Sequence, residues 1–471
     1  MKKEMLLIWC LLFFLYLNSS FCQVNSGFQK SNEDYGSLSY NDAEHPCISE
    51  EQYLLIEKRC KENIQMLKLN GMVNRNSPEA ILFNWPLKAA NGLNDCSFYR
   101  VSAYVDQNTS SGSFQDFNCG TNTYDAHRGT DISIWPFNFY KMDHDLVEVI
   151  AAAPGIILDK HDGEFDKNCA ANNLTANYLI IRHADGSQAN YWHMKKNSLT
   201  KKAIGQSVVA GEFLGIVGSS GSSSGPHLHF EVWAGSTVAT RIDPFAGNCN
   251  TLNATSWWAN QKSYMETGIV KVSVNTTDIV YPACPATETP NESDTYQIPF
   301  QGAGLAPGFA KFYIFIRDEL VGLTANMSIL NPDGTTFTSW TYMSTAASKT
   351  KINGFSKKLP TTPGVYTFMA NYNGTSCSKA FKITTATHTV NLNHENKSII
   401  YPNPSNGNFI LEFKENVATE IEIYNLLGVL VYRATIIKPI SEFNLNLPAN
   451  VYLYQLRNKN NVTDTGKLLI E

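Results

Sequence analysis

Histidine residues are concentrated in one part of this 471-residue chain, since seven of the ten lie between positions 127 and 229. His227 and His229 form a His-x-His motif within the run 225–232 (GPHLHFEV). Side chains two residues apart point the same way from a β-strand, so both imidazoles can converge on one point. His127 and Asp131 form a second motif, and their spacing of four places both side chains on one face of a helix or one side of a strand.

A third histidine, His193, ends the aromatic run 191–193 (YWH). Two histidines and one carboxylate that leave a fourth position open make a catalytic zinc set. These ligand types suit zinc, although they do not exclude other metals. Either motif alone is common among surface residues. The prediction of one Zn²⁺ ion therefore depends on finding both motifs and the third histidine in the same segment.

The segment that carries these residues has the pattern of β-structure. Over 81–250, short strand-like runs alternate with Gly, Asn and Asp turns, at 147–150, 156–158, 178–181, 213–217 and 229–232. A second segment, 277–385, has strand-like runs at 311–316, 324–330 and 364–371, and predicts an immunoglobulin-like β-sandwich. The polar stretch 386–397 is predicted to be a linker, and 398–471 a further small β-module. The chain is thus predicted to be mainly β.

The amino-terminal residues predict export. Two lysines precede an apolar run over 5–17, which is too short to span a bilayer and suits a secretory signal peptide over 1–22. A short membrane anchor is the alternative. Residues 23–80 are predicted to be a leader or prosegment that is partly helical. No later segment is long and apolar enough to cross a membrane.

Helical spacing within this leader extends from Glu50 to Leu69, and Asn70-Gly71 provides a plausible end. The apolar positions predicted to be buried are Leu54, Leu55, Ile64, Met66 and Leu67.

Charge and cysteine content agree with an exported chain. The 37 basic and 42 acidic residues give a net charge of −5, which offers no electrostatic basis for binding nucleic acid. Eight cysteines follow residue 22 without a Cys-x-x-Cys pair, which favours disulfides over a cysteine zinc site. We expect Cys284 to pair with Cys377, because they bracket one β-rich segment. The other pairings stay open among Cys47, Cys60, Cys96, Cys119, Cys169 and Cys249.

The segment 81–250 also resembles the lysostaphin-type zinc metallopeptidases, the LytM/DD-endopeptidase group of peptidoglycan endopeptidases. The resemblance is carried by the order of five motifs, 127–131 (HRGTD), 149–156 (VIAAAPGI), 177–183 (NYLIIRH), 191–193 (YWH) and 225–231 (GPHLHFE). The sequence departs from the family at Ile156, where valine is usual, and in an unusually serine-rich loop over 218–225.

This resemblance implies a compact antiparallel catalytic sheet and a role for each motif residue. His127, Asp131 and His229 would hold the zinc, whereas His193 and His227 would be active-site histidines that do not bind it. Zinc makes hydroxide available near neutral pH and polarises the scissile carbonyl. One histidine would take a proton and the other would donate to the oxyanion and the leaving amine. Which histidine is the base stays open.

The resemblance also bears on three other features. The loop 218–225 is predicted to line the groove and to let the substrate backbone approach closely. The leader 23–80 is either a prosegment that blocks the groove, as in some family members, or a solvated stabilising helix. His183 matches a family position, and we expect it to orient the sheet rather than to bind metal.

The carboxy-terminal segment 398–471 resembles the type A sorting domain of the type IX secretion system of Gram-negative bacteria. Its motifs are 401–409 (YPNPSNGNF), 421–428 (IEIYNLLG) and 466–468 (GKL). The resemblance implies that the type IX machinery is a partner and that the chain is secreted or held at the cell surface, with no stable membrane span. A further β-sandwich for binding is the alternative.

Together these features predict an exported zinc-dependent metalloendopeptidase that hydrolyses peptide bonds in peptidoglycan cross-links or in glycine-rich extracellular proteins. Two alternatives belong to other functional classes. One is a catalytically silent cell-wall-binding protein with the same fold, and the other is an adhesin in which the sandwich 277–385 binds the target.

Overall fold

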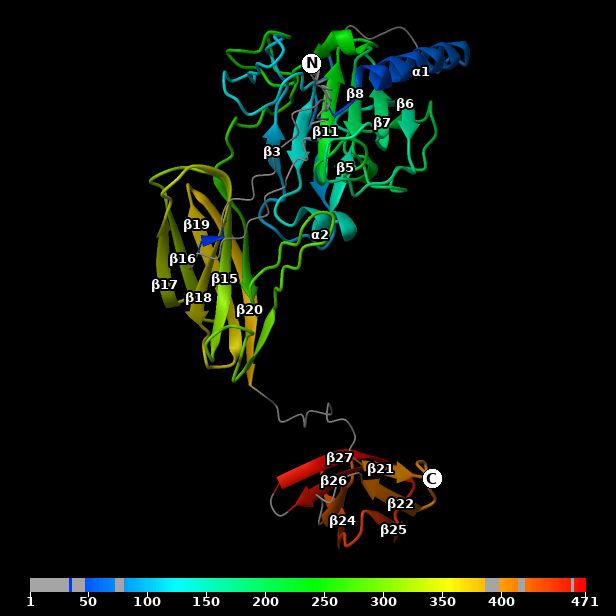
Figure 1. Cartoon of the computed structure of the whole chain (residues 1–471), viewed down its shortest axis with the longest axis vertical. Coiled ribbons are helices and arrows are strands. Elements are labelled where there is room, and N and C mark those ends of the chain that lie inside the picture. Colours follow the sequence, from blue (N-terminus) through cyan, green and yellow to red (C-terminus); the bar gives the residue numbers. More distant parts are fainter. Residues whose placement is uncertain (1–33, 36–46, 73–79, 386–397, 414–419, 459–460) are drawn as a thin grey trace, which may run out of the picture. The chain divides into compact units, whose positions relative to one another are not determined.

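The computed structural model describes residues 34–35, 47–72, 80–385, 398–413, 420–458 and 461–471 (Figure 1). These residues form many strands and few helices, as the sequence predicted. The chain divides into two compact units, Met1–Thr385 and Ala386–Glu471, which are described separately. The predicted signal peptide 1–22, the predicted linker 386–397 and part of the predicted leader lie outside the described residues.

An eight-stranded antiparallel sheet forms the centre of the first unit. Its strand β11 (His227–Trp233) pairs on one side with β4 (Thr130–Ser133) and on the other with β8 (Gln188–Trp192), so motifs far apart in the sequence become neighbours. The other strands are β3 (Arg100–Ala103), β7 (Tyr178–Arg182), β6 (Gly155–His161), β9 (Ser207–Val208) and β12 (Arg241–Ile242). The predicted antiparallel sheet is confirmed.

The two faces of this sheet carry different layers. Leu228, Phe230 and Val232 of β11 belong to a hydrophobic core shared with a three-stranded sheet. That second sheet consists of β10 (Phe213–Ile216), β5 (Val147–Ile150) and β2 (Leu87–Ala89).

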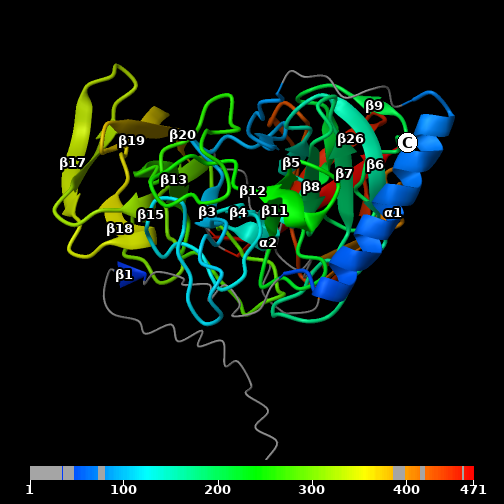
Figure 2. The same ribbon diagram turned by 90° about the horizontal axis from the view of Figure 1, so that it is seen from above.

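The opposite face of the sheet is covered by helix α1 (Glu50–Leu69), which lies beside β6 in both views (Figures 1 and 2). Trp233 packs in a second core together with residues of α1. Successive side chains of a strand point to opposite faces. The odd-numbered residues of β11, His227 and His229 included, therefore lie on the same face of the sheet as α1.

The ends of α1 lie where the sequence predicted them. Ser49 accepts a hydrogen bond from the backbone N–H of Gln52, and the Gln52 side chain accepts one from the backbone of Ser49, which makes a capping box. Asn70 follows the last helical residue, as predicted.

The face that α1 buries differs from the predicted one. Tyr53, Ile56, Cys60, Ile64 and Leu67 are buried, three or four residues apart. Ile64 and Leu67 were predicted, but Leu54, Leu55 and Met66 are exposed, so that part of the prediction is wrong. Each residue turns the helix by about 100°. Leu54 and Leu55 therefore point away from the buried stripe that Tyr53 begins.

The predicted β-sandwich occupies the rest of the first unit. One of its sheets contains β1 (Asp34–Tyr35), β18 (Ser348–Lys358), β15 (Phe309–Glu319) and β13 (Gly268–Asn275). The other contains β14 (Thr295–Ile298), β20 (Thr375–Thr385), β19 (Gly364–Tyr372), β16 (Thr324–Leu330) and β17 (Thr336–Met343). Both sheets contribute to one core. The helices α2 (Asn138–Asp143) and η1 (Val238–Thr240) complete this unit.

Among the described residues of the first unit there are three disulfides, Cys96–Cys377, Cys119–Cys249 and Cys169–Cys284. The predicted pairing of Cys284 with Cys377 is wrong. Cys284 packs against the core of the eight-stranded sheet, whereas Cys377 belongs to the core of the sandwich. Each of them bonds to a cysteine of the segment 81–250. Two disulfides therefore tie the sandwich to the segment that carries the histidines.

The second unit is a small β-structure with its own core. One sheet contains β21 (Ser398–Tyr401), β22 (Asn408–Phe413) and β25 (Ile440–Asn444). The other contains β24 (Leu430–Thr435), β23 (Glu420–Tyr424), β26 (Asn450–Asn458) and β27 (Asn461–Ile470). Throughout the described residues, no helix is long and apolar enough to cross a membrane.

Candidate functional site

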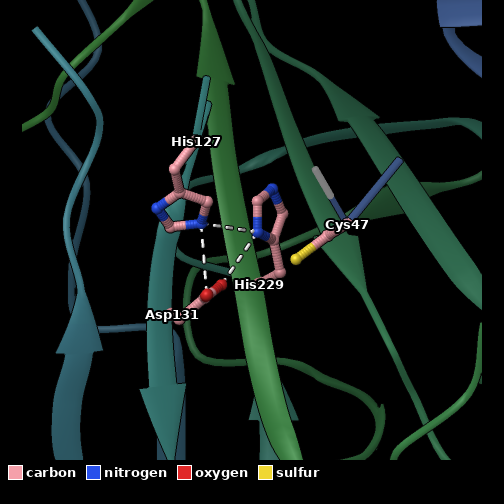
Figure 3. Close-up of side chains that lie close together, drawn as sticks. All are labelled: Cys47, His127, Asp131 and His229. Carbon is pink, nitrogen blue, oxygen red and sulfur yellow. Dashed lines mark hydrogen bonds and ion pairs between the residues drawn. The ribbon is translucent and has the colours of Figure 1, made fainter. Parts of the chain in front are cut away.

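The structure brings together the three residues predicted to hold zinc (Figure 3). Asp131 on β4 lies opposite His229 on β11, and His127 lies in the loop before β4. His229 Nδ1 lies 2.8 Å from Asp131 Oδ1 and 3.2 Å from His127 Nε2. His127 Nε2 lies 3.2 Å from Asp131 Oδ2. All three side chains are buried.

These distances and donor types fit one zinc ion. Zinc bound tetrahedrally at about 2.0–2.1 Å places its ligand atoms roughly 3.3 Å apart. The His127 and His229 nitrogens lie 3.2 Å apart, and the two Asp131 oxygens lie 2.8 Å and 3.2 Å from them. His127 Nδ1 donates to the carbonyl oxygen of Tyr104 at 2.6 Å, which leaves the Nε2 lone pair directed at the cluster. The donor set of two imidazoles and a carboxylate thus suits a zinc site with one further position.

Gly129, between the two ligands of the 127–131 motif, makes room for this cluster. A Cβ atom at this position would lie 2.6 Å from His229 Nε2 and 2.9 Å from the carbonyl oxygen of Phe230. Any larger residue would therefore push the His229 ring or the neighbouring backbone aside.

His193 and His227 lie beside the cluster as a pair, with ring centroids 4.7 Å apart. His193 Nδ1 donates to the carbonyl oxygen of Ser220 at 2.6 Å, and His227 Nδ1 to that of Gly225 at 2.8 Å. A carbonyl oxygen can only accept, so each Nδ1 carries a proton and each Nε2 presents a lone pair in the neutral ring. Neither Nε2 has a hydrogen-bond partner among the described residues.

The serine-rich loop 218–225 supports this histidine pair. Ser219, Ser220 and Ser223 are buried, and the Ser220 hydroxyl donates to the carbonyl oxygen of Met194 at 2.9 Å. The prediction that this loop lines the substrate groove concerns its backbone and stays a prediction. Short hydroxyl side chains fit a tight space and satisfy buried carbonyl groups there, which holds the loop against the ring of His193.

The pKa values of the two histidines are shifted in opposite directions. Burial lowers the pKa of His193. Burial acts in the same direction on His227, but the Asp131 carboxylate, 3.6 Å from His227 Nε2, raises the pKa of His227 to about 9. Burial alone would raise the pKa of Asp131, yet the charges of His127 and His227 hold it well below its usual range.

The sequence analysis missed Cys47 as a residue of this site. Its sulfur lies with the donor atoms of His127, Asp131 and His229 in one group whose members are all within 4.8 Å of one another. It forms a similar group with His193 and His227. The sulfur also makes a 2.7 Å hydrogen bond with the hydroxyl of Tyr124. Cys47 was counted among the disulfide candidates, and its place in the leader, outside the segment 81–250, was the only sequence signal that set it apart.

The other described histidines lie away from these contacts. His183 Nδ1 donates to the carbonyl oxygen of Pro154 at 2.8 Å and its ring packs on Phe83, in line with the predicted structural role. His144 is exposed, and His161 pairs with Glu164.

Comparison with known proteins finds family matches for two parts of the chain. Residues 126–244 match Peptidase family M23, and residues 399–471 match the Secretion system C-terminal sorting domain. The chain therefore contains an M23 peptidase domain and, at its carboxy-terminal end, a type IX sorting domain, as both resemblances predicted. The sorting domain indicates export to the cell surface or beyond it.

Several curated proteins resemble parts of the chain. An uncharacterized metalloprotease of Buchnera aphidicola is 30% identical over 135 residues, which is 29% of this chain and 28% of that protein. The peptidoglycan DD-endopeptidase ShyC of Vibrio cholerae is 31% identical over 106 residues, 22% of this chain and 20% of that protein. The DD-carboxypeptidase/endopeptidase Mpg of Neisseria meningitidis is 47% identical over 55 residues, 12% of each chain. The chain thus spans less than a third of each relative's length.

Solved structures resemble the chain over a limited part. The catalytic domain of the prophage-encoded M23 protein EnpA from Enterococcus faecalis is 23% identical with a TM-score of 0.21, and the match covers 35% of this chain and 94% of that chain. A zinc containing peptidase from Vibrio cholerae is 20% identical with a TM-score of 0.21, covering 38% of this chain and 41% of that chain.

Proposed function

We propose that this chain is an exported zinc-dependent endopeptidase. The observation that carries the proposal is the cluster of His127, Asp131 and His229, in which each side chain has a donor atom 2.8–3.2 Å from one of each of the other two. The Nε2 atoms of His193 and His227 lie beside it without a hydrogen-bond partner among the described residues. In this proposal these three residues hold one zinc ion. Zinc, when bound, supplies the Lewis acidity that polarises a scissile carbonyl and makes hydroxide available near neutral pH.

The two remaining histidines handle protons in this proposal. His193 is neutral near pH 7 because burial lowers its pKa, so its Nε2 can accept a proton from the attacking nucleophile. His227 Nε2 lies 3.6 Å from Asp131 Oδ1, at the edge of the cluster, so the protonated ring can donate its Nε2–H to the oxyanion and then to the leaving amine. The backbone carbonyls of Ser220 and Gly225 keep both Nε2 atoms directed away from the loop.

The proposed substrates are peptide cross-links of peptidoglycan, with glycine-rich extracellular proteins as the second candidate. The names of ShyC and Mpg support the first class, since ShyC is named a peptidoglycan DD-endopeptidase and Mpg a DD-carboxypeptidase/endopeptidase. Export by the sorting domain favours a target outside the producing cell over its own wall.

Cleavage with two purified substrates tests this proposal. The zinc-loaded full chain is incubated separately with peptidoglycan and with elastin, and mass spectrometry identifies the new amino termini. The Cys47→Ala chain is assayed in parallel, because the Cys47 sulfur lies at the site. We expect new termini from peptidoglycan peptides. New termini from elastin alone would indicate that the substrates are extracellular proteins and not peptidoglycan. No cleavage by either zinc-loaded chain would contradict the proposed activity and favour a silent binding protein.

Metal analysis of variants tests the ligand assignment. Asp131→Ala and His127→Ala should lose zinc together with activity. His144→Ala is the matched control, because His144 is an exposed histidine of the same domain. Stoichiometric zinc in a folded Asp131→Ala chain would refute the assignment.

A further inference from the structure

The thiol of Cys47 reaches the proposed zinc site from outside the M23 domain. Its sulfur shares one group of donor atoms with His127, Asp131 and His229, all within 4.8 Å of one another. Figure 3 shows this sulfur directed toward Asp131 and His229. The sequence separates Cys47 from Tyr124, its hydrogen-bond partner, by 77 residues. This contact is therefore made by the tertiary fold.

Cys47 does not form a disulfide with any described residue. Cys60, the other free cysteine among the described residues, is buried in α1 ten residues after the helix begins. Ten residues of α-helix span about 15 Å. A disulfide requires Cα atoms within about 7 Å of each other. The two thiols therefore do not serve as a disulfide pair.

The donor set around Cys47 has the composition of a closed zinc site. A thiolate binds zinc at about 2.3 Å, and two histidines, one carboxylate and one thiolate together complete a tetrahedral set. Catalytic zinc sites keep three protein ligands and leave the fourth position to water or substrate. A fourth protein ligand at this position would exclude both.

Contacts of α1 hold Cys47 in place. Ile48 is buried beside it, and Ser49 begins α1 through its capping box. The Tyr53 hydroxyl donates to Glu231 Oε1 at 2.6 Å, and Glu231 lies on β11 two residues after His229. The guanidinium of Arg128, inside the 127–131 motif, lies 4.6 Å from the centre of the Tyr53 ring.

Further along, polar side chains of α1 bind to β6 of the eight-stranded sheet and to η1. Arg59 pairs with the buried carboxylate of Asp159 on β6 at 2.8 Å, and the Asn63 side chain donates to the carbonyl oxygen of Leu158 at 2.9 Å. Glu57 accepts from the backbone N–H of Val238 at 2.8 Å. The helix therefore covers the sheet face on which His227 and His229 lie.

We propose that Cys47 is a fourth, inhibitory ligand of the zinc site, and that the segment 47–72 keeps the enzyme latent by filling the open position and covering the sheet face beside it. This inference rests on the proposed zinc peptidase function. It assigns to the leader the blocking role that the sequence left undecided, and it names the residue responsible. Loss of the sulfur ligand, by removal of the segment or by substitution, opens the fourth position.

Cobalt substitution tests the sulfur ligand directly. The full chain is loaded with Co²⁺, and a sulfur-to-cobalt charge-transfer band is sought in the near-ultraviolet spectrum. We expect the band in the wild-type chain and in Cys60→Ala, the matched control that removes a thiol from the same segment. We expect Cys47→Ala to lose the band and still bind one equivalent of Co²⁺. A wild-type chain that binds Co²⁺ without the band would overturn the proposal.

Thiol labelling gives a second readout that needs no activity. Iodoacetamide should modify Cys47 in the EDTA-treated chain and leave it unmodified in the zinc-loaded chain, as read by peptide mass spectrometry. Equal labelling of Cys47 in both states would overturn the assignment.

Activity then tests latency separately from ligation. The zinc-loaded Cys47→Ala chain should cleave peptidoglycan faster than the wild-type chain, while Cys60→Ala stays as slow as wild type. Equal rates for an active wild-type chain and Cys47→Ala would overturn latency. A cobalt band that depends on Cys47, together with no cleavage by Cys47→Ala, would refute the peptidase function and leave the sulfur ligand established.

Discussion

Substitution of Gly129 tests whether the spacing of the two strands β4 and β11 sets the metal site. In Gly129→Ala the new methyl carbon would lie 2.6 Å from Nε2 and 2.7 Å from Cε1 of His229. To restore an ordinary contact of roughly 3.4 Å, the imidazole has to move by about 0.8 Å. The backbone offers little relief, since the carbonyl oxygen of Phe230 lies 2.9 Å from the same methyl position.

The expected consequence is weaker zinc binding by a folded chain. Loss of a group that orients a metal ligand typically weakens metal binding about 10–100-fold, which corresponds to about 1.4–2.8 kcal/mol. We expect Gly129→Ala to fall in this range. Competition with a chromophoric chelator measures the zinc affinity, and urea unfolding of the metal-free chain measures stability.

Gly155→Ala is the matched control for this experiment. Its methyl carbon would meet the carbonyl oxygen of Arg182 at 2.5 Å, a comparable clash in the same sheet but away from the three proposed ligands. We expect Gly155→Ala to lower stability without a matching loss of zinc affinity. Wild-type zinc affinity in Gly129→Ala would refute the argument that the glycine makes room for His229.

Three further predictions concern proton transfer, pH and cross-linking. His193→Ala and His227→Ala should each retain zinc and lower kcat by about 10²–10⁴-fold, as measured by metal analysis and steady-state kinetics. Loss of the metal in either variant would show that the replaced histidine is a ligand. Burial raises the pKa of Asp243 to about 8, so the folded chain holds a proton there that the unfolded chain releases above about pH 4. The contribution of Asp243 to stability is therefore full below that pH and is lost as pH rises toward about 8. In Asp243→Asn the midpoints of urea unfolding at about pH 5 and pH 8 should be more alike than in the wild-type chain. The same difference between the two midpoints in both chains would contradict this. Replacing both Cys169 and Cys284 by alanine removes a disulfide that spans 115 residues. For a loop of that size, chain entropy limits the loss of folding free energy to about 5 kcal/mol. The melting temperature should fall, and an unchanged value would show that this disulfide adds no stability.

Local patterns in the sequence predicted much of the site. The alternation of β11 placed His227 and His229 on one side of a strand, as the structure has them. The spacing of His127 and Asp131 predicted that their side chains could meet, and they lie 3.2 Å apart. The first relation follows from strand geometry alone. The second does not, because His127 lies in the loop before β4 and Asp131 on the strand itself.

Other features depend on partners far along the chain, and local patterns do not identify such partners. Leu54 and Leu55 are as apolar as the residues that α1 buries, and only the surface of the sheet decides which face of the helix is covered. Cys377 bonds to Cys96 across 281 residues rather than to Cys284. The serines at 218–225 have the composition of an exposed linker, and the fold buries four of them, Ser219, Ser220, Ser222 and Ser223.

The amino-acid sequence by itself determined the types of chemical group, the strands and helix that carry them, and both family resemblances. Tertiary structure decided which groups share a site. Asp131 and His229 meet because β4 and β11 pair in one register, which a shift of one residue would destroy. Cys47 joins them because α1 docks on the same face of the sheet. Its place depends on packing over long sequence separations, and no spacing within the leader encodes it.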